Sequence, residues 1–164
     1  MINIKKHLVS ILFLLFLSSF SLSAQTAAEL DVLLETNEIS TAKAARFVLG
    51  AVQLLPAKLT GSEAEKEAYK IAQSNGWIKS GAEDSISLKD LSFLVIKAFS
   101  IKGGLMYSMA KNPRYAYREL IYRKIIQGRS DPAMKVSGQR LLHIIDRAFQ
   151  YAEESGALDV EPQV

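Results

Sequence analysis

The stretch from Val136 to Phe149, "VSGQRLLHIIDRAF", decides the fold because it recurs twice earlier in the chain. Residues 86–99 read "ISLKDLSFLVIKAF" and residues 39–52 read "ISTAKAARFVLGAV", so the copies are 47 and 50 residues apart. Each copy opens on Ile or Val followed by serine. The three copies then have apolar residues at the same four positions, which lie five, eight, nine and twelve residues after the leading Ile or Val. In that order, these residues are Ala44, Leu91 and Leu141; Phe47, Leu94 and Ile144; Val48, Val95 and Ile145; and Ala51, Ala98 and Ala148. This spacing places them on one face of a helix, and the serine stands where an N-cap belongs.

A second helix is predicted before each of these. In the middle copy it is "SEAEKEAYKIAQSNGWI" (62–78), with Ser62 or Gly61 as N-cap and Asn75-Gly76 as the stop. In the last copy it is "NPRYAYRELIYRKIIQG" (112–128), with Pro113 in the first turn and Gly128 just beyond the end. In the first copy it is the shorter "TAAELDVLLETNE" (26–38).

Each copy is therefore predicted to form a leading helix, a turn and a second helix with a serine N-cap, which we call the capped helix. Short amphipathic helix pairs bury their apolar faces only by packing together, so three copies are expected to form one compact all-α bundle. We expect one domain over residues 25–153, with repeats at about 26–55, 61–101 and 112–153. Residues 154–164 are expected to form a flexible tail.

The N-terminal segment has the layout of a secretory signal peptide. Lys5 and Lys6 precede an apolar run from Leu8 to Leu17, and small residues follow up to Ala24. A membrane anchor is the weaker alternative, because about ten apolar residues are half of what a spanning helix needs. The chain contains no cysteine, which excludes disulfides and lipid attachment through cysteine. We expect cleavage of residues 1–24, a periplasmic or secreted protein, and no stable membrane span afterwards.

Basic residues are concentrated in the last copy. Without the two signal lysines the chain carries 18 basic and 17 acidic residues, so its global charge implies no particular partner. Residues 111–147, in contrast, hold 9 basic residues against Glu119, Asp131 and Asp146. This segment is either a surface for an anionic ligand or a solvated face that pairs with those acids and with the acidic tail. Nucleic acid is a poor partner for an exported protein.

Residues suited to catalysis are scarce. His143 is the one histidine left after cleavage, no cysteine nucleophile exists, and the repeated serines are explained as helix caps. The loops lack the alternating acids of a calcium site. We therefore expect a non-enzymatic protein without a cofactor or a bound metal.

The repeat resembles the S-layer homology (SLH) domain family. The last copy carries the resemblance best, with leading aromatics Tyr115 and Tyr117, the "IIQG" turn (125–128), the "SDP" loop (130–132) and the closing Arg147-Ala148-Phe149. The middle copy has Gly76-Trp77-Ile78 and Ile86. The resemblance implies a pseudo-threefold helical body that binds anionic cell-wall polysaccharide in grooves between modules. The family's Thr-Arg-Ala-Glu motif corresponds here to "STAK" (40–43), "SLKD" (87–90) and "SGQR" (137–140), of which only Asp90 keeps the acid.

Two functions remain open from the sequence. The first is a periplasmic or cell-envelope binding protein that contacts an anionic polymer such as peptidoglycan. Its candidate ligand-binding residues are Arg114, Arg118, Arg129, Arg140, Arg147, Trp77 and Asp90. Trp77 is either a plug over the core or a platform for sugar stacking. The second is a protein-interaction scaffold in an envelope or motility assembly, suggested by the altered motif and the apolar "GGLMYSM" connector (103–109). A carrier for an apolar ligand is a third, minor possibility that requires an enclosed cavity.

Overall fold

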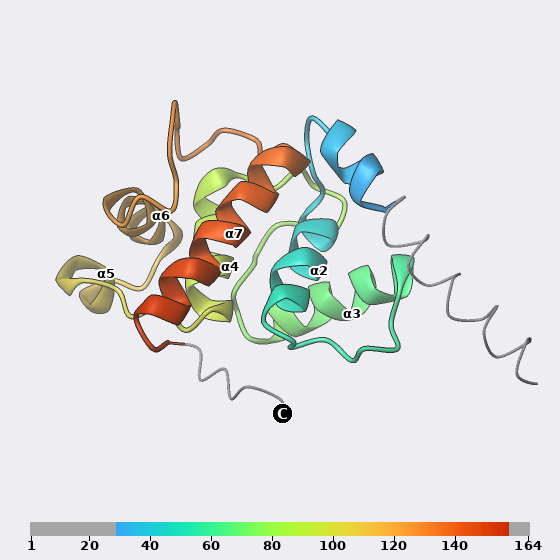
Figure 1. Ribbon diagram of the computed structural model, residues 1–164, viewed down its shortest axis with the longest axis horizontal. Helices are drawn as coiled ribbons and strands as arrows, with labels where there is room; N and C mark the ends of the chain where they lie inside the picture. The colour runs from blue at the N-terminus through green and yellow to red at the C-terminus, as the bar shows by residue number, and fades with distance from the viewer. Residues whose placement is uncertain (1–28, 158–164) are drawn as a thin grey trace, which may run out of the picture. The chain divides into compact units, whose positions relative to one another are not determined.

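The computed structural model describes residues 29–157, and all regular elements in that range are helices. Residues 29–35 are helical, and the labelled helices that follow are α2 (Thr41–Ala51), α3 (Gly61–Ser74), α4 (Leu88–Ala98), α5 (Leu105–Met109), α6 (Pro113–Tyr122) and α7 (Gly138–Glu154) (Figure 1). The predicted all-α class is confirmed. The predicted signal peptide over 1–24 and residues 158–164 of the predicted tail lie outside the described residues.

The chain divides into two compact units, Met1–Glu35 and Thr36–Val164. Helices α2 to α7 all belong to the second unit, and so does every contact described below. Between residues 29 and 157, no helix has both the length and the apolarity needed to cross a bilayer.

The three predicted serine caps are present at the starts of α2, α4 and α7. The hydroxyl oxygens of Ser40, Ser87 and Ser137 each accept a hydrogen bond from the amide three residues later, at 3.3 Å in every case. These bonds satisfy one of the amides that an α-helix leaves unpaired at its start. The prediction of three equivalent N-caps is confirmed.

Other amides at these starts are paired with backbone carbonyls from another copy, two in α2, two in α4 and one in α7. In α2, the amides of Thr41 and Ala42 donate to the carbonyls of Asp84 and Ala82, at 2.9 and 3.0 Å. In α4, the amides of Leu88 and Lys89 donate in the same way to Met134 and Pro132, at 2.8 and 3.0 Å. The amide of Gly138 in α7 donates to Thr36 at 2.9 Å. The first copy is thus bonded to the second, the second to the third, and the third to the first.

The residues that precede the cap serines meet at the centre of this arrangement. The amide of Ile39 donates to the carbonyl of Val136 at 2.9 Å, and the amide of Ile86 donates to the carbonyl of Ile39 at 3.0 Å. All three side chains are fully buried. The leading Ile or Val of each copy is therefore a shared core residue where the copies join.

The helices pair differently from the predicted units, in which the two helices of one copy belong together. Helix α3 packs mainly on α2, and α6 packs mainly on α4, so these two leading helices lie against the capped helix of the preceding copy. The connecting loops explain this, because their carbonyls accept hydrogen bonds from the first amides of that same preceding helix. The accepting carbonyls are those of Ala82 and Asp84 for α2, and of Pro132 and Met134 for α4. Tyr69 and Tyr117 hold these loops to α3 and α6 through Ser80 and Ser130, at 3.0 and 3.1 Å.

Two predicted helix boundaries are wrong and one is confirmed. The N-cap of α3 is Thr60, one residue before Gly61 and without a side-chain capping bond. Gly76 does follow the end of α3, in the left-handed conformation that ends many helices (φ +67°). Helix α6 ends at Tyr122, well before Gly128, because Lys124 itself adopts the left-handed conformation (φ +60°). The following residues, Ile125 and Ile126, are buried.

The predicted inner faces of the capped helices are mostly buried, with three informative exceptions. Nine of the twelve predicted residues are buried, from Ala44 in α2 to Ala148 in α7. Phe47, Ala51 and Ile145 are only half-buried. These three positions belong to α2 and α7, and they line a groove described below.

Replacement of each cap serine by alanine tests the shared starts of the helices. We expect S40A, S87A and S137A each to lower the free energy of unfolding by about 1 kcal/mol, because an amide at the helix start loses its partner. Urea denaturation measures the change. S62A is the matched control, since Ser62 is exposed in the first turn of α3 and is not its cap; its effect is expected to stay within about 0.5 kcal/mol. Equal effects of S62A and the cap variants would contradict the assignment.

Candidate ligand-binding surface

The start of α6 presents two of the predicted arginines. Asn112 caps this helix, its Oδ1 accepting from the amides of Arg114 and Tyr115 at 3.0 and 3.1 Å, and Pro113 occupies the first turn. Arg114 and Arg118 then lie one turn apart, and both are exposed. Neither guanidinium group makes a hydrogen bond or ion pair within residues 29–157.

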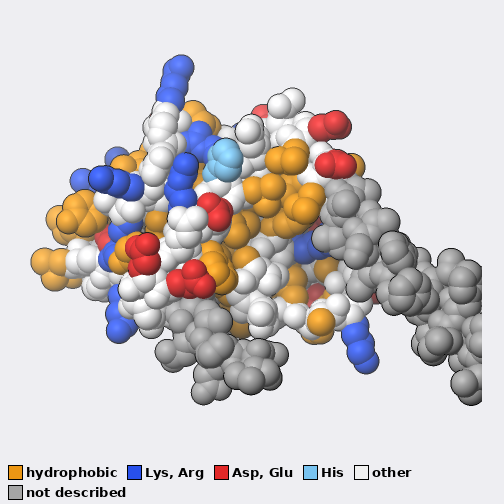
Figure 2. Space-filling view, in the orientation of Figure 1, with side chains coloured by type: hydrophobic (Ala, Val, Ile, Leu, Met, Phe, Trp, Pro, Cys, Tyr) orange, Lys and Arg blue, Asp and Glu red, His pale blue; other side chains and the backbone are white. Residues whose placement is uncertain are grey.

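Two further predicted arginines are brought together by the loop after α6. Nη2 of Arg140 donates to the backbone carbonyl of Arg129 at 3.0 Å, and its Nη1 contacts Sδ of Met134 at 3.0 Å. Arg140 therefore holds the loop in place, while the side chain of Arg129 stays exposed. Figure 2 shows Lys and Arg side chains gathered over this side of the molecule, near α6 and the loop.

The three acids of this segment do not neutralise those arginines. Glu119 pairs with Arg123, with Oε1 and Nε 2.7 Å apart. Asp131 accepts from the amide of Ala133 at 2.8 Å, which stabilises the loop, and Asp146 accepts from the side-chain amide of Gln150 at 3.1 Å. Among the described residues, the positive charge of Arg114, Arg118 and Arg129 is left without an acidic partner.

The other predicted site residues lie elsewhere or have structural contacts. Arg147 is half-buried on α7, two turns after Arg140 and on the same side of the helix. Trp77 is half-buried just after α3, the helix that packs on α2 rather than on α4. Asp90 accepts a hydrogen bond from the Ser87 hydroxyl at the start of α4. Arg114, Arg118 and Arg129 are thus the exposed arginines, and none of the seven predicted residues lines the apolar groove or the cavity between α4 and α5.

The larger cavity is an apolar groove of about 700 Å³. Its walls come from α2, α7 and the segment that joins α2 to α3, including Phe47, Ala51, Leu55, Leu142 and Ile145. Arg46 also lines it. The groove is open to solvent, and it is therefore unlike the enclosed cavity that a carrier of apolar ligands requires.

Arg123 is an important residue that the sequence did not single out from its basic neighbours. Besides Glu119, it contacts the carbonyl of Lys102 through Nη2 at 2.6 Å and stacks over the ring of Tyr151 at 4.7 Å from its centroid. It thereby connects the end of α6 to the connector before α5 and to α7. The Glu-to-Arg spacing of four residues is the signal that identifies such a pair in a helix.

Within the described range, no group of three or more His, Asp or Glu side chains is placed to hold a metal ion. Comparison of the chain with protein-family models, with curated protein sequences and with solved structures finds no match.

Alanine substitutions at Arg123 and Arg118 should separate the structural arginine from the exposed ones. R123A leaves the largely buried Glu119 carboxylate without its partner, so we expect a loss of about 3 kcal/mol in the free energy of unfolding. R118A removes an exposed, unpaired group, and the expected change is within about 0.5 kcal/mol. Urea denaturation of both variants is the measurement, and a comparable loss in R118A would refute the distinction.

Proposed function

We propose that this chain is a non-enzymatic, SLH-like binding protein of the cell envelope. In this proposal, the exported protein is a three-repeat body that contacts an anionic envelope polymer such as peptidoglycan. The contact surface consists of Arg114, Arg118, Arg129 and Arg140, which we call the arginine surface.

The cyclic pairing of the three copies supports the SLH-like part of the proposal. Equivalent serines cap α2, α4 and α7, and carbonyls of one copy satisfy amides of another in the same order each time. A pseudo-threefold helical body is what the resemblance to SLH modules implies. The recurrence of the same contacts at spacings of 47 and 50 residues favours that arrangement over an irregular helical bundle.

The unpaired charge on the arginine surface supports the ligand class, and it is the observation that carries the proposal. A guanidinium group offers parallel donors that match a carboxylate or phosphate with two hydrogen bonds. Arg114, Arg118 and Arg129 are exposed, and the neighbouring acids are engaged with other groups. A repeating anionic polymer would engage several of these arginines at once, so weak individual contacts would add up.

Co-sedimentation with purified peptidoglycan tests the arginine surface. The chain is expressed with its own N-terminal segment and the exported form is purified. We expect binding that weakens with added salt, and an affinity lowered at least tenfold in R114A/R118A/R129A, because exposed charge contacts are screened and each arginine adds a bidentate donor.

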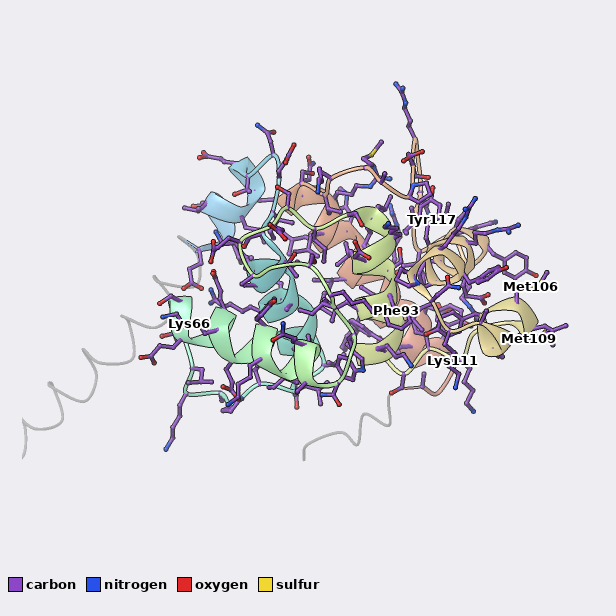
Figure 3. The ribbon with its side chains drawn as sticks, turned by 180° about the vertical axis from the view of Figure 1, so that it is seen from behind. Lys66, Phe93, Met106, Met109, Lys111 and Tyr117 are labelled. Atoms are coloured by element: carbon purple, nitrogen blue, oxygen red, sulfur yellow. The ribbon has the colours of Figure 1, made fainter. Side chains whose placement is uncertain are left out.

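The matched control is K58A/K66A/K79A, which removes three exposed lysines outside the arginine surface. Figure 3 shows Lys66 at the opposite end of the second unit from Tyr117 of α6. The control variant is expected to bind like the unmodified protein. Absence of peptidoglycan binding, or equal losses in the two triple variants, would contradict the proposal.

A protein-interaction scaffold is the second candidate, and the apolar groove favours it. Phe47, Ala51 and Ile145 stand at positions that are core positions in the other copies, yet here they line an open groove. A partner that presents apolar side chains would bury them. The altered Thr-Arg-Ala-Glu motif fits the same view, since it removes the residues that hold polysaccharide in the family.

A photo-crosslinking amino acid at Leu55, in the groove, tests the scaffold function in cells. We expect one dominant crosslinked protein, absent when the crosslinker replaces the exposed Lys66 on α3 instead. A product spectrum that is the same from both positions would count against the scaffold.

A further inference from the structure

A second cavity, of about 600 Å³ and as open to solvent as the groove, lies where α4 ends and α5 begins. Its lining comes from residues 96–111, and the charged members are Lys97, Lys102 and Lys111. The hydroxyl-bearing residues Ser100 and Ser108 also line it, whereas no aspartate or glutamate does. We call this the lysine cavity. Its composition is that of a site for an anion.

The sequence around the lysine cavity adds further positive charge. From Leu91 to Arg118 the chain contains five basic residues and no acid. The next acid, Glu119, is paired with Arg123 and is therefore largely neutralised. Lys97 is held at the cavity, with its ammonium group 5.4 Å from the centroid of the Phe93 ring. The Glu119 carboxylate does lie beside Gly104, next to the cavity, but its charge is offset by Arg123, and the three lysines of the cavity form no ion pair among the described residues.

The hydroxyl of Tyr107 is an independent sign of a ligand. Tyr107 lines the cavity and is only 5% exposed, and its hydroxyl has no hydrogen-bond partner among the described residues. Its ring is closely packed, because a Cβ on Gly103 would lie 2.2 Å from Cδ1. Burial raises the pKa of this phenol, so it keeps its proton at neutral pH and can donate. The hydroxyl oxygen is itself shielded from solvent in the unbound protein, so an anionic oxygen in the cavity could accept from it once the Tyr107 side chain shifts.

The outer side of α5 is apolar and solvent-exposed. Leu105, Met106 and Met109 are 77%, 64% and 78% exposed, in the same helix that turns Tyr107 inward. Figure 3 shows Met106 and Met109 projecting outward from α5, on the same side of the molecule as Lys111. Exposed apolar side chains beside lysines are typical of segments that lie in the interfacial region of a membrane.

We propose that the lysine cavity and the outer side of α5 together dock the protein on an anionic phospholipid bilayer. The cavity takes the phosphate of one headgroup, with the three lysines as donors and the Tyr107 hydroxyl as a further donor after its side chain shifts. Leu105, Met106 and Met109 enter the boundary between headgroups and acyl chains. This function is additional to polymer binding, and its residues differ from those of the arginine surface.

A bilayer accounts for more of these features than other anionic ligands do. A free phosphate would occupy the cavity but leave three large apolar side chains in water. A bilayer places phosphates and acyl chains within a few ångströms of each other, so it matches the cavity and α5 at the same time. Peripheral docking of this kind needs no spanning helix.

Vesicle co-sedimentation of the exported protein tests the proposal. One set of vesicles contains phosphatidylcholine alone, and the other also contains phosphatidylglycerol. We expect binding to the anionic vesicles, weakened by salt, and little binding to the neutral ones. K97A/K102A/K111A is expected to lower the affinity roughly 100-fold, at about fivefold for each lysine near an anionic surface.

Two further variants separate the apolar and hydroxyl contributions. L105S/M106S/M109S changes exposed side chains only and is expected to weaken vesicle binding at least tenfold. Y107F removes a hydroxyl that has no partner in the protein, so its melting temperature should be unchanged or higher. It should nevertheless bind anionic vesicles about tenfold more weakly, because the phosphate loses a donor. K58A/K66A/K79A is expected to bind like the unmodified protein.

Several outcomes would overturn the proposal. These are equal binding to neutral and anionic vesicles, no vesicle binding at all, or a loss in K58A/K66A/K79A as large as in the lysine-cavity variant. Inorganic phosphate is the probe for the alternative source. If it raises the melting temperature through Tyr107 and the lysines while vesicles do not bind, the cavity is a site for soluble phosphate. The peptidoglycan-binding experiment can succeed or fail independently of the vesicle experiment, because its variants change the arginine surface and leave the lysine cavity intact.

Discussion

The starts of α2, α4 and α7 impose the constraint on which the rest of the second unit depends. A helix that begins inside a protein leaves amides without intrahelical partners, and burying them unpaired is costly. Here a serine satisfies one amide of each helix, and carbonyls from another copy satisfy others. No capped helix can therefore form its complete start without a neighbouring copy. This explains why α3 and α6 lie against the capped helix of the preceding copy.

That arrangement also determines which surfaces are available for function. The loop over residues 123–137 docks on α4 through the carbonyls of Pro132 and Met134, and its outer side carries Arg129 near α6. The connector after α4 has no cap serine and turns instead into the short helix α5, which exposes apolar side chains beside three lysines. The two proposed binding surfaces are thus segments that the cyclic pairing leaves free.

Local patterns predicted much of the fold. Serine caps and helical spacing act within a few residues, so α2, α4 and α7 were evident from the sequence, as was the exposure of Arg114 and Arg118. Which helices pack against each other was not evident from the sequence, because this depends on hydrogen bonds between residues more than forty positions apart, such as Thr41 and Asp84. The end of α6 was misplaced because Lys124 adopts a conformation that glycine prefers. The lysine cavity was missed because its residues follow no helical period and its key hydroxyl is identified only by its burial.

Native-state hydrogen exchange measured by NMR tests the central claim most directly. The amides of Thr41, Ala42, Leu88, Lys89 and Gly138 are expected to exchange together, at rates set by unfolding of the whole second unit. The amides of Ser62 and Glu63 at the start of α3, a helix without a side-chain cap, are the internal reference and should exchange much faster. Fast exchange at Thr41 and Leu88, comparable to that at Ser62, would contradict the cyclic pairing of the three copies.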